Sequence, residues 1–219
     1  MKSYLKKIVK RITVIFVPFF QSYCKFKLSL SNHVSLGMYI KFRLRRNKDI
    51  YWPVHKNSEI THPQNIYVGL NSNAGTRPGC YLQGNGGIYI GNYVHFASNI
   101  GVISANHNEK DQMKHILKEV RIGDYTWIGM NTVILPGVVL GPRTIVGAGS
   151  VVTKSFPEGF CIIAGNPAKV IKTLDKKEFR PTTFRTECYG FIAKEEFVPF
   201  AKKHLRNNRY YQEMIDVSR

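Results

Sequence analysis

Aliphatic side chains recur at every sixth position through the middle of this chain. Six consecutive positions of this period are occupied by Ile122, Ile128, Ile134, Leu140, Val146 and Val152, and four of them precede a glycine. A helix has a period of 3.6 residues, and each glycine inside one would destabilise it by about 1 kcal/mol. A period of six fits the two-residue period of a strand if the chain turns a corner every few residues. The pattern therefore predicts a parallel β-helix with short flat faces, relaxed at its corners by Gly, Asn or Asp.

The same phase extends upstream through Ile90, Phe96 and Val102. A second inward position, two residues before each of these, holds small or β-branched residues that suit a tight stack: Ile88, Val94, Ile100, Val120, Thr126, Thr132, Val138, Thr144 and Ser150. A β-sandwich of short strands is the alternative fold, but it has no reason to keep a strict six-residue phase. The phase breaks only between Val102 and Ile122, where polar and charged residues predict a projecting loop over residues 104–119.

The two ends of the chain differ in composition from this repeat. The net charge of the 219 residues is +18, but residues 57–168 carry 7 basic residues against 6 acids, whereas residues 1–56 carry 13 against one. We expect three parts: a basic amphipathic helix over residues 1–24, the β-helix over residues 25–170, and a C-terminal extension over residues 171–219. The extension is expected to be helical around residues 195–205.

Residues 1–24 have apolar positions at helical spacing, with lysine and arginine largely opposite them. Their apolar stretch is too short for a transmembrane span of about 20 residues, and no signal-peptide cleavage site follows it. Two interpretations remain open. The helix could lie on an anionic inner-membrane surface, or it could pack on the open end of the β-helix and cover an unpaired edge.

Residues 25–46 alternate basic and apolar side chains, which predicts strands with one basic outer face. No nucleic-acid-binding motif accompanies this face, so we do not expect a nucleic-acid partner. The four cysteines, Cys24, Cys80, Cys161 and Cys188, form no CxxC pair. Their spacing favours a reduced compartment, the cytoplasm, over a disulfide framework.

His107 is the candidate for chemistry, because it lies at the base of the predicted loop. Loops on a rigid scaffold can position reactive groups, and an imidazole with a pKa near ~6.5 can accept a proton from a hydroxyl at neutral pH. From composition alone, a solvated surface histidine is the alternative.

The chain resembles the hexapeptide-repeat acyltransferases, which fold as a left-handed parallel β-helix. The resemblance covers about residues 65–173 and rests on the segments IYIGNYVHFASNIGVISANHN, VRIGDYTWIGMNTVILPGV and VGAGSVVTKSFPEGFCIIAGNPAKVI. The last segment is similar to the signature of the sugar O-acetyltransferase branch, which includes galactoside and maltose acetyltransferases. The resemblance implies a homotrimer, direct transfer from acetyl-CoA, and His107 as the general base.

The resemblance also implies binding residues. Positions matching the CoA contacts are Met130, Ala148, Thr153, Lys154 and Lys169, and Met130 departs from the small polar residue usual in relatives. On the acceptor side the match is weaker and points to Asn85 and Arg77. The resemblance implies that acetyl-CoA binds in a slot between neighbouring subunits, and Trp127 is expected to pack beside this slot. For the lysines, Asn85 and Arg77, simple solvation at a corner is the alternative.

Other mechanisms fit the sequence less well. Cys80 and Cys161 have no matched base, so no acyl-enzyme is expected. A zinc site like that of the γ-type carbonic anhydrases would need three histidines, and the spacing of His95, His107 and His115 does not match, so no metal is expected. The leading hypothesis is sugar O-acetylation in surface-polysaccharide assembly at the inner face of the plasma membrane. The alternatives are a xenobiotic acetyltransferase, similar to those for streptogramin or chloramphenicol, and a non-enzymatic trimeric scaffold.

Overall fold

The computed structural model describes residues 21, 35–44, 49–181, 184 and 186–216. The predicted basic helix over residues 1–24 therefore lies almost wholly outside the described residues. No helix within the described ranges is long and apolar enough to cross a membrane.

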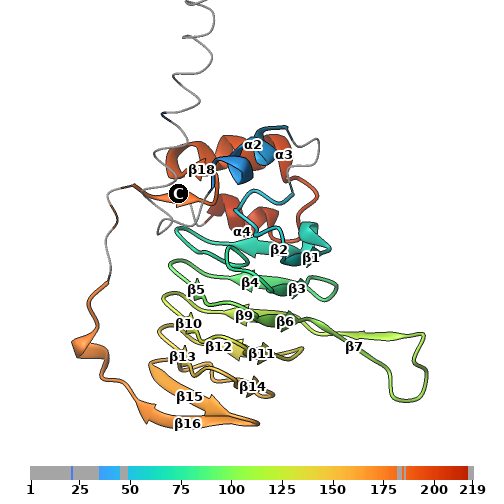
Figure 1. The fold of residues 1–219 in the computed structure, drawn as a ribbon, viewed down its shortest axis with the longest axis vertical. Coiled ribbons are helices and arrows are strands. Elements are labelled where there is room, and N and C mark those ends of the chain that lie inside the picture. Colours follow the sequence, from blue (N-terminus) through green and yellow to red (C-terminus); the bar gives the residue numbers. More distant parts are fainter. Residues whose placement is uncertain (1–20, 22–34, 45–48, 182–183, 185, 217–219) are drawn as a thin grey trace, which may run out of the picture.

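The described chain is built around a coil of short parallel strands that form three sheets (Figure 1). The first sheet contains β1 (Glu59–Thr61), β3 (Tyr81–Gln83), β6 (Gly101–Ile103), β11 (Val133–Ile134) and β14 (Val151–Val152). The second contains β2 (Ile66–Val68), β4 (Ile88–Ile90), β9 (Val120–Ile122) and β12 (Val139–Leu140). The third contains β5 (His95–Phe96), β10 (Trp127–Ile128), β13 (Ile145–Val146), β15 (Cys161–Gly165) and β16 (Ala168–Thr173). Within these three sheets the strands pair in parallel, except for β15 and β16, which are antiparallel.

The register confirms three hexapeptides per turn, because Trp127 pairs with Ile145, the equivalent position three repeats further along the chain. The predicted inward positions are buried. The six aliphatic residues at every sixth position from Ile122 to Val152 are at most 1% exposed, and the hydroxyl side chains at the second inward position are fully covered. These hydroxyls avoid a desolvation penalty by donating to glycine carbonyls, as Thr144 Oγ1 does to Gly141 O at 2.8 Å and Ser150 Oγ to Gly147 O at 2.6 Å. The predicted parallel β-helix of hexapeptide repeats is confirmed.

The glycines that follow the aliphatic positions stack tightly on one another. A Cβ built on Gly141 would lie 2.1 Å from Pro157 O and 2.5 Å from Gly159 N, which are backbone atoms of the next turn. A Cβ on Gly123 would likewise lie 2.7 Å from the backbone of Gly141. The coil can therefore close this corner only where the side chain is a hydrogen atom.

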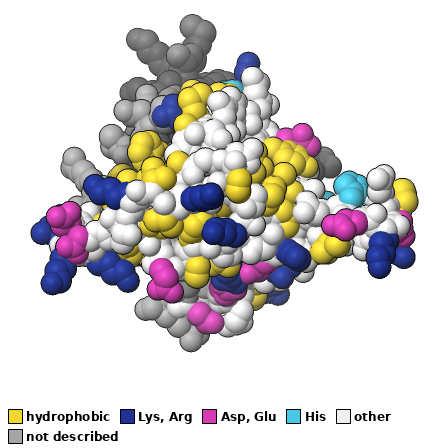
Figure 2. All heavy atoms as spheres, turned by 90° about the horizontal axis from the view of Figure 1, so that it is seen from below, with side chains coloured by type: hydrophobic (Ala, Val, Ile, Leu, Met, Phe, Trp, Pro, Cys, Tyr) yellow, Lys and Arg dark blue, Asp and Glu magenta, His cyan; other side chains and the backbone are white. Residues whose placement is uncertain are grey.

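The break in the six-residue phase is a β-hairpin that projects from the coil (Figure 1). It consists of β7 (Ala105–His107) and β8 (His115–Leu117), which pair antiparallel. An uninterrupted phase would place Met113 beside His95, but the partner of His95 is Trp127, so the hairpin is inserted within a single turn. Figure 2 shows the hairpin extending to the right of the coil, with apolar, acidic and basic side chains near its tip.

The segment that precedes the coil differs from the prediction. Where strands were expected within residues 25–46, the described part forms the helix α2 (Leu36–Leu44), which buries Tyr39 and Phe42. Alternation of basic and apolar residues was a misleading signal here, because the two buried rings lie three residues apart and share one helical face. Phe42 stacks on Phe191 of the C-terminal extension, with ring centroids 4.6 Å apart.

The C-terminal extension returns to the first turn of the coil and covers it (Figure 1). It contains β17 (Cys188–Tyr189), β18 (Ile192–Ala193), α3 (Phe197–His204) and α4 (Tyr211–Asp216), together with one-turn 3-10 helices at Lys176–Glu178 and Lys194–Glu196. A third one-turn 3-10 helix, Pro63–Asn65, lies between β1 and β2. The expected helix around residues 195–205 is confirmed by α3. Asn208 Nδ2 donates to Ile66 O at 3.1 Å, so the extension supplies hydrogen bonds to the edge strand β2. It therefore occupies the open end that one interpretation gave to the N-terminal helix.

The C-terminal extension also contacts the residues that follow β8, where the chain returns from the hairpin to the coil. Tyr210 Oη donates to Glu119 Oε2 at 2.9 Å, directly before β9. Arg121, the central residue of β9, forms an ion pair with Glu213 of α4 at 3.2 Å and lies over the Tyr89 ring. The hairpin thus begins and ends on segments that are held in place by the coil and by the C-terminal extension.

Candidate functional site

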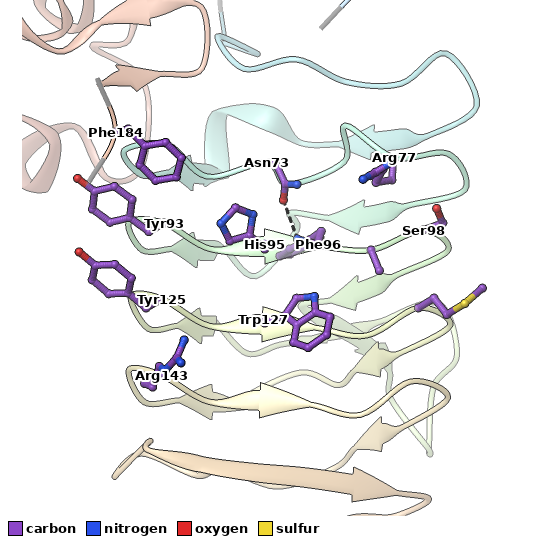
Figure 3. A pocket seen from close by; sticks show the side chains of 12 residues that line it. Asn73, Arg77, Tyr93, His95, Phe96, Ser98, Tyr125, Trp127, Arg143 and Phe184 are labelled. Carbon is purple, nitrogen blue, oxygen red and sulfur yellow. Dashed lines mark hydrogen bonds between the residues drawn. The ribbon is translucent and has the colours of Figure 1, made fainter. Parts of the chain in front are cut away.

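A hollow of about 640 Å³ lies on the third sheet, across β5 and β10. His95 and Trp127 form its floor, side by side in the ladder between these strands (Figure 3). Tyr93, Tyr125 and Arg143 lie at the corner that precedes the strands, and Ser98 lies at the opposite end (Figure 3). The remaining lining residues are Asn73, Arg77, Phe96, Ala97, Met130 and Phe184. We refer to this hollow as the sheet pocket.

The corner of the sheet pocket carries large side chains on strained backbone. Tyr93, Tyr125 and Arg143 have φ values of 57°, 57° and 58°, in the left-handed region that bulky residues seldom adopt. The two tyrosine rings are stacked, with centroids 4.7 Å apart and an interplanar angle of 12°. Phe184, from the segment between β16 and β17, stacks on the other face of Tyr93 at 5.7 Å. This corner is therefore a rigid aromatic wall.

A short polar chain fixes the wall to the C-terminal extension. The Tyr93 hydroxyl donates to Glu187, which also accepts a hydrogen bond from Lys194 Nζ at 2.6 Å. The ammonium of Lys194 and the Tyr93 hydroxyl together lower the pKa of Glu187 below its usual range. Desolvation and the hydrogen bond to Glu187 raise the pKa of Tyr93, so the phenol stays neutral and acts as a donor.

The floor of the pocket combines an open aromatic face with a neutral imidazole. Trp127 is 54% exposed although it lies within a sheet. His95 lies beside it, and burial lowers the pKa of this imidazole below its ordinary value. His95 is therefore uncharged near pH 7, and it can both donate and accept hydrogen bonds there.

We expect replacement of His95 by glutamine to reduce the loss of stability in mild acid. With a lowered pKa in the folded state, His95 favours folding above pH ~6.5, and that contribution is lost as the pH falls toward the lowered pKa. The urea midpoint, measured at pH 7.5 and at pH 5.5, should therefore fall less in His95→Gln than in the unaltered protein. His115→Gln, at an exposed position on the hairpin, is the control. Equal losses in the unaltered protein and His95→Gln would contradict this prediction.

His107 lies on the hairpin and not in the sheet pocket of its own chain. Its Nδ1 atom is 2.6 Å from the backbone oxygen of Gln112, and its ring lies 4.5 Å from the ring of His115. A carbonyl oxygen can only accept, so the proton of the neutral imidazole is on Nδ1. The Nε2 atom is then the basic nitrogen, and it belongs to an exposed side chain.

The other predicted site residues fall into three groups. Arg77 and Met130 both line the sheet pocket, together with Trp127. Asn85 lies outside the pocket, in the turn between β3 and β4. Its backbone oxygen accepts a hydrogen bond from Asn65 Nδ2 at 3.5 Å. The remaining predicted CoA contacts lie further along the coil and are exposed: Ala148, Thr153, Lys154 and Lys169.

Met130 and Ala148 occupy equivalent places on successive turns. Gly149 N donates to Met130 O at 2.8 Å, so the corner after β10 stacks directly on the corner after β13. An extended chain could run from Met130 past Ala148 along this corner toward Lys169, which pairs with Ala164 on the next turn. The structure thus places two predicted CoA contacts in one line, although no single hollow encloses the whole set.

Sequence reasoning missed Tyr93, Tyr125 and Arg143. Each follows the repeat glycine by two positions, in the triplets GNY, GDY and GPR. A large residue at this corner, where Asn or Gly is expected, was the available signal. For metals, the described residues contain no group of three or more His, Cys, Asp or Glu side chains that could hold an ion.

Comparison with known proteins agrees with the hexapeptide-repeat fold. Residues 119–154 match the family model of the bacterial transferase hexapeptide, six repeats. The galactoside O-acetyltransferase of Lactococcus lactis is 31% identical over 97 residues, which are 42% of this chain and 46% of the relative. This chain spans between 46% and 62% of the lengths of the first curated relatives that it matches.

Two solved structures share the fold. A maltose O-acetyltransferase from Clostridium difficile has a TM-score of 0.51 and 33% identity, covering 56% of this chain and 66% of its own. A hexapeptide-repeat acetyltransferase from Vibrio cholerae, solved with acetyl-CoA, has a TM-score of 0.54 and 26% identity, covering 69% and 86%. The resemblance of this chain to the hexapeptide-repeat acyltransferases, in their galactoside and maltose O-acetyltransferase branch, is confirmed.

Proposed function

We propose that this protein is an acetyl-CoA-dependent O-acetyltransferase that acts on a sugar hydroxyl, with His107 as the general base. The observation that carries the proposal is the contact between His107 Nδ1 and Gln112 O. It leaves Nε2 free of the proton and orients the ring, both of which a general base needs before it can accept a proton from an acceptor hydroxyl. The likeness to galactoside and maltose O-acetyltransferases supports the substrate class.

The reaction is direct transfer. The acceptor hydroxyl gives its proton to His107 Nε2 as its oxygen forms a bond to the thioester carbonyl carbon of acetyl-CoA. The tetrahedral intermediate then collapses, the carbon–sulfur bond breaks, and the imidazolium returns the proton to the sulfur of CoA. Lys154 and Lys169 are exposed cations that fit the phosphates of the nucleotide end.

We further propose that the active form is a homotrimer in which the hairpin of one subunit completes the sheet pocket of the next. The hairpin leaves the coil between the first and second sheets, whereas the pocket lies on the third. In a single chain the base and the pocket are therefore apart. Exposed apolar residues on both surfaces support the contact, with Met113 at 88% on the hairpin and Met130 at 47% in the pocket.

Mixed trimers test this arrangement. We expect His107→Ala and Trp127→Ala each to lose acetyl transfer, measured as CoA release together with the mass of one acetyl group on the acceptor. Trimers assembled from both variants should recover activity, because one subunit supplies the hairpin and its neighbour the pocket. A lack of recovery in verified mixed trimers would contradict a shared site.

The same transfer assay, run with a panel of sugars and drugs, tests the alternative functions. Binding of acetyl-CoA without transfer to any sugar or drug acceptor would favour the scaffold alternative. Transfer to streptogramin or chloramphenicol alone would favour the xenobiotic acetyltransferase.

We propose that the enzyme works on lipid-linked glycans at the inner face of the plasma membrane. The proposal rests on the charge of residues 1–56, which carry 13 basic residues against one acid. Such a segment attracts anionic lipid headgroups, at about 1 kcal/mol per basic residue near the surface. We expect deletion of residues 1–20 to release the protein from anionic liposomes in a sedimentation assay, with neutral liposomes as control. Undiminished binding after the deletion would contradict a role of this segment in membrane attachment.

A further inference from the structure

The sheet pocket has a positive character that a neutral sugar does not need. Arg77 and Arg143 line it at diagonally opposite corners (Figure 3), and none of its lining residues is an aspartate or glutamate. Within the described part of the chain, neither arginine takes part in an ion pair. A half-buried guanidinium without a carboxylate is a strong potential site for an anion, because charge-assisted hydrogen bonds exceed neutral ones in strength.

Arg143 has an unfavourable backbone conformation. Its φ of 58° is disfavoured for a long side chain, and such residues destabilise the fold by about 1–3 kcal/mol each. The opposite corner of the same sheet adopts this conformation with Asn99, Asn131 and Gly149, which tolerate it. The two corners have similar backbones, so the difference lies in the side chains that the strained corner presents to the pocket.

Aromatic groups hold Arg143 in place. Its guanidinium lies 5.3 Å above the ring of Phe179, which in turn meets the Tyr125 ring edge to face at 5.0 Å. One face of the guanidinium is thus covered by Phe179, which Tyr125 in turn supports. The planar N–H groups of Arg143 remain available at the rim, and such a fork matches the oxygens of a carboxylate or phosphate.

The floor beside the arginines suits a sugar ring. Trp127 offers an open aromatic face, against which the C–H face of a pyranose can stack. Asn73 uses Oδ1 to accept a hydrogen bond from Phe96 N at 2.6 Å, so its amide is held in one orientation. Its NH₂ group is thereby oriented as well, at the lining of the pocket, where it can donate to a sugar hydroxyl.

We propose that the natural acceptor is an anionic sugar, carrying a carboxylate or a phosphate ester that Arg143 binds while the ring stacks on Trp127. Arg77 contributes a second positive charge on the other side of the ring. This inference rests on the proposed function, because it concerns the acceptor of the same transfer reaction. It adds the chemical class of that acceptor and assigns Arg143 a role in selecting it.

Matched sugars test the proposal. The full chain, with saturating acetyl-CoA and at constant ionic strength, is given methyl glucoside, glucuronate or glucose 6-phosphate, together with the corresponding galactose series. We expect kcat/KM for at least one anionic sugar to exceed that of its neutral counterpart by 10-fold or more, and the carboxylate and phosphate arms identify the anion. Arg143→Gln should reduce this preference by about 10–100-fold, the range for a lost charged hydrogen bond. Arg206→Gln, at an exposed position after α3, is the matched control and should leave the preference intact.

The same assay distinguishes binding of the sugar by Arg143 from binding of acetyl-CoA by Arg143. If Arg143→Gln raises KM for acetyl-CoA and leaves the sugar preference unchanged, the arginine binds CoA phosphates and the proposal is overturned. Equal transfer to neutral and anionic sugars by the unaltered enzyme also overturns it, while the proposed function stands. Binding is measured by calorimetry on the same sugars: Arg143-dependent binding of an anionic sugar without transfer supports the inference and contradicts the proposed function. Transfer and binding that both lack an anionic preference contradict the inference.

Discussion

Replacement of His107 by alanine is expected to lower kcat for acetyl transfer by about 10²–10⁴-fold, the usual contribution of a general base. The Nδ1 contact with Gln112 O already fixes the proton on one side of the ring, and the alanine variant removes the nitrogen that would accept the second proton. The fold should be unaffected, because the side chain is exposed on a hairpin outside the coil. The measurement is the steady-state rate of CoA release with an acceptor sugar present, at saturating acetyl-CoA.

His115→Ala is the matched control, because this second imidazole lies on the same hairpin with its ring 4.5 Å from that of His107. The prediction is that its effect on kcat is much smaller. If His115→Ala abolished transfer and His107→Ala did not, the base would be His115. If neither substitution changed the rate, the hairpin would have no part in the chemistry.

The second large effect concerns the folding of the coil. We expect Gly141→Ala to destabilise the protein by about 3 kcal/mol or more, which is at the upper end for a single substitution. The added Cβ would lie 2.1 Å from Pro157 O and 2.5 Å from Gly159 N, and backbone atoms of a neighbouring turn cannot rotate away. Chemical denaturation, followed by circular dichroism, measures the loss directly.

Gly101→Ala provides the comparison, because it adds the same methyl group to a strand of the same coil. Its nearest neighbours would be the methyl groups of Val133 at 3.7 Å, an ordinary van der Waals contact. The stability of Gly101→Ala should stay within about 0.5 kcal/mol of the unaltered protein or exceed it slightly. Similar losses for the two variants would show that packing between turns is not what demands glycine at position 141.

The coil was predictable because its signal is local and repeated. Each turn buries residues at fixed offsets, so the positions from Ile122 to Val152 carry the period in the sequence itself. The interruption after Val102 was visible for the same reason, since a break in a strict phase has to leave the coil. The hairpin pairing between β7 and β8 was not visible, because residues 104–119 have no alternation of their own.

The covering of the first turn was not predictable from the sequence. It depends on contacts between segments from opposite ends of the described chain, such as Cys188 N with Asn71 Oδ1 at 2.9 Å. Residues 35–44 alternate in a way that suits a strand, yet Tyr39 and Phe42 pack as one helical face against Phe191. Tertiary packing decided between two elements that local propensity left close in free energy.

The candidate site was predictable only in part. Resemblance placed Arg77, Met130 and Trp127, and the structure brings them together in the sheet pocket. The wall of Tyr93 and Tyr125 depends on how the corners of two successive turns stack across the inserted hairpin, and on Phe184 arriving from the C-terminal side. The triplets GNY and GDY mark where these rings sit in the repeat, but they do not show which aromatic rings stack on one another.

The return of the C-terminal extension to the first turn has a consequence for synthesis on the ribosome. The chain emerges from its N-terminal side, so β1 and β2 can pair with later turns well before residues 188–216 exist. Until those residues are made, Ile66 O in the edge strand β2 lacks the hydrogen bond from Asn208, and the ring of Tyr51 lacks its contact with Phe197. A nascent chain that has not reached residue 208 therefore has an open strand edge at β2, and such edges are prone to edge-to-edge association until the extension is complete.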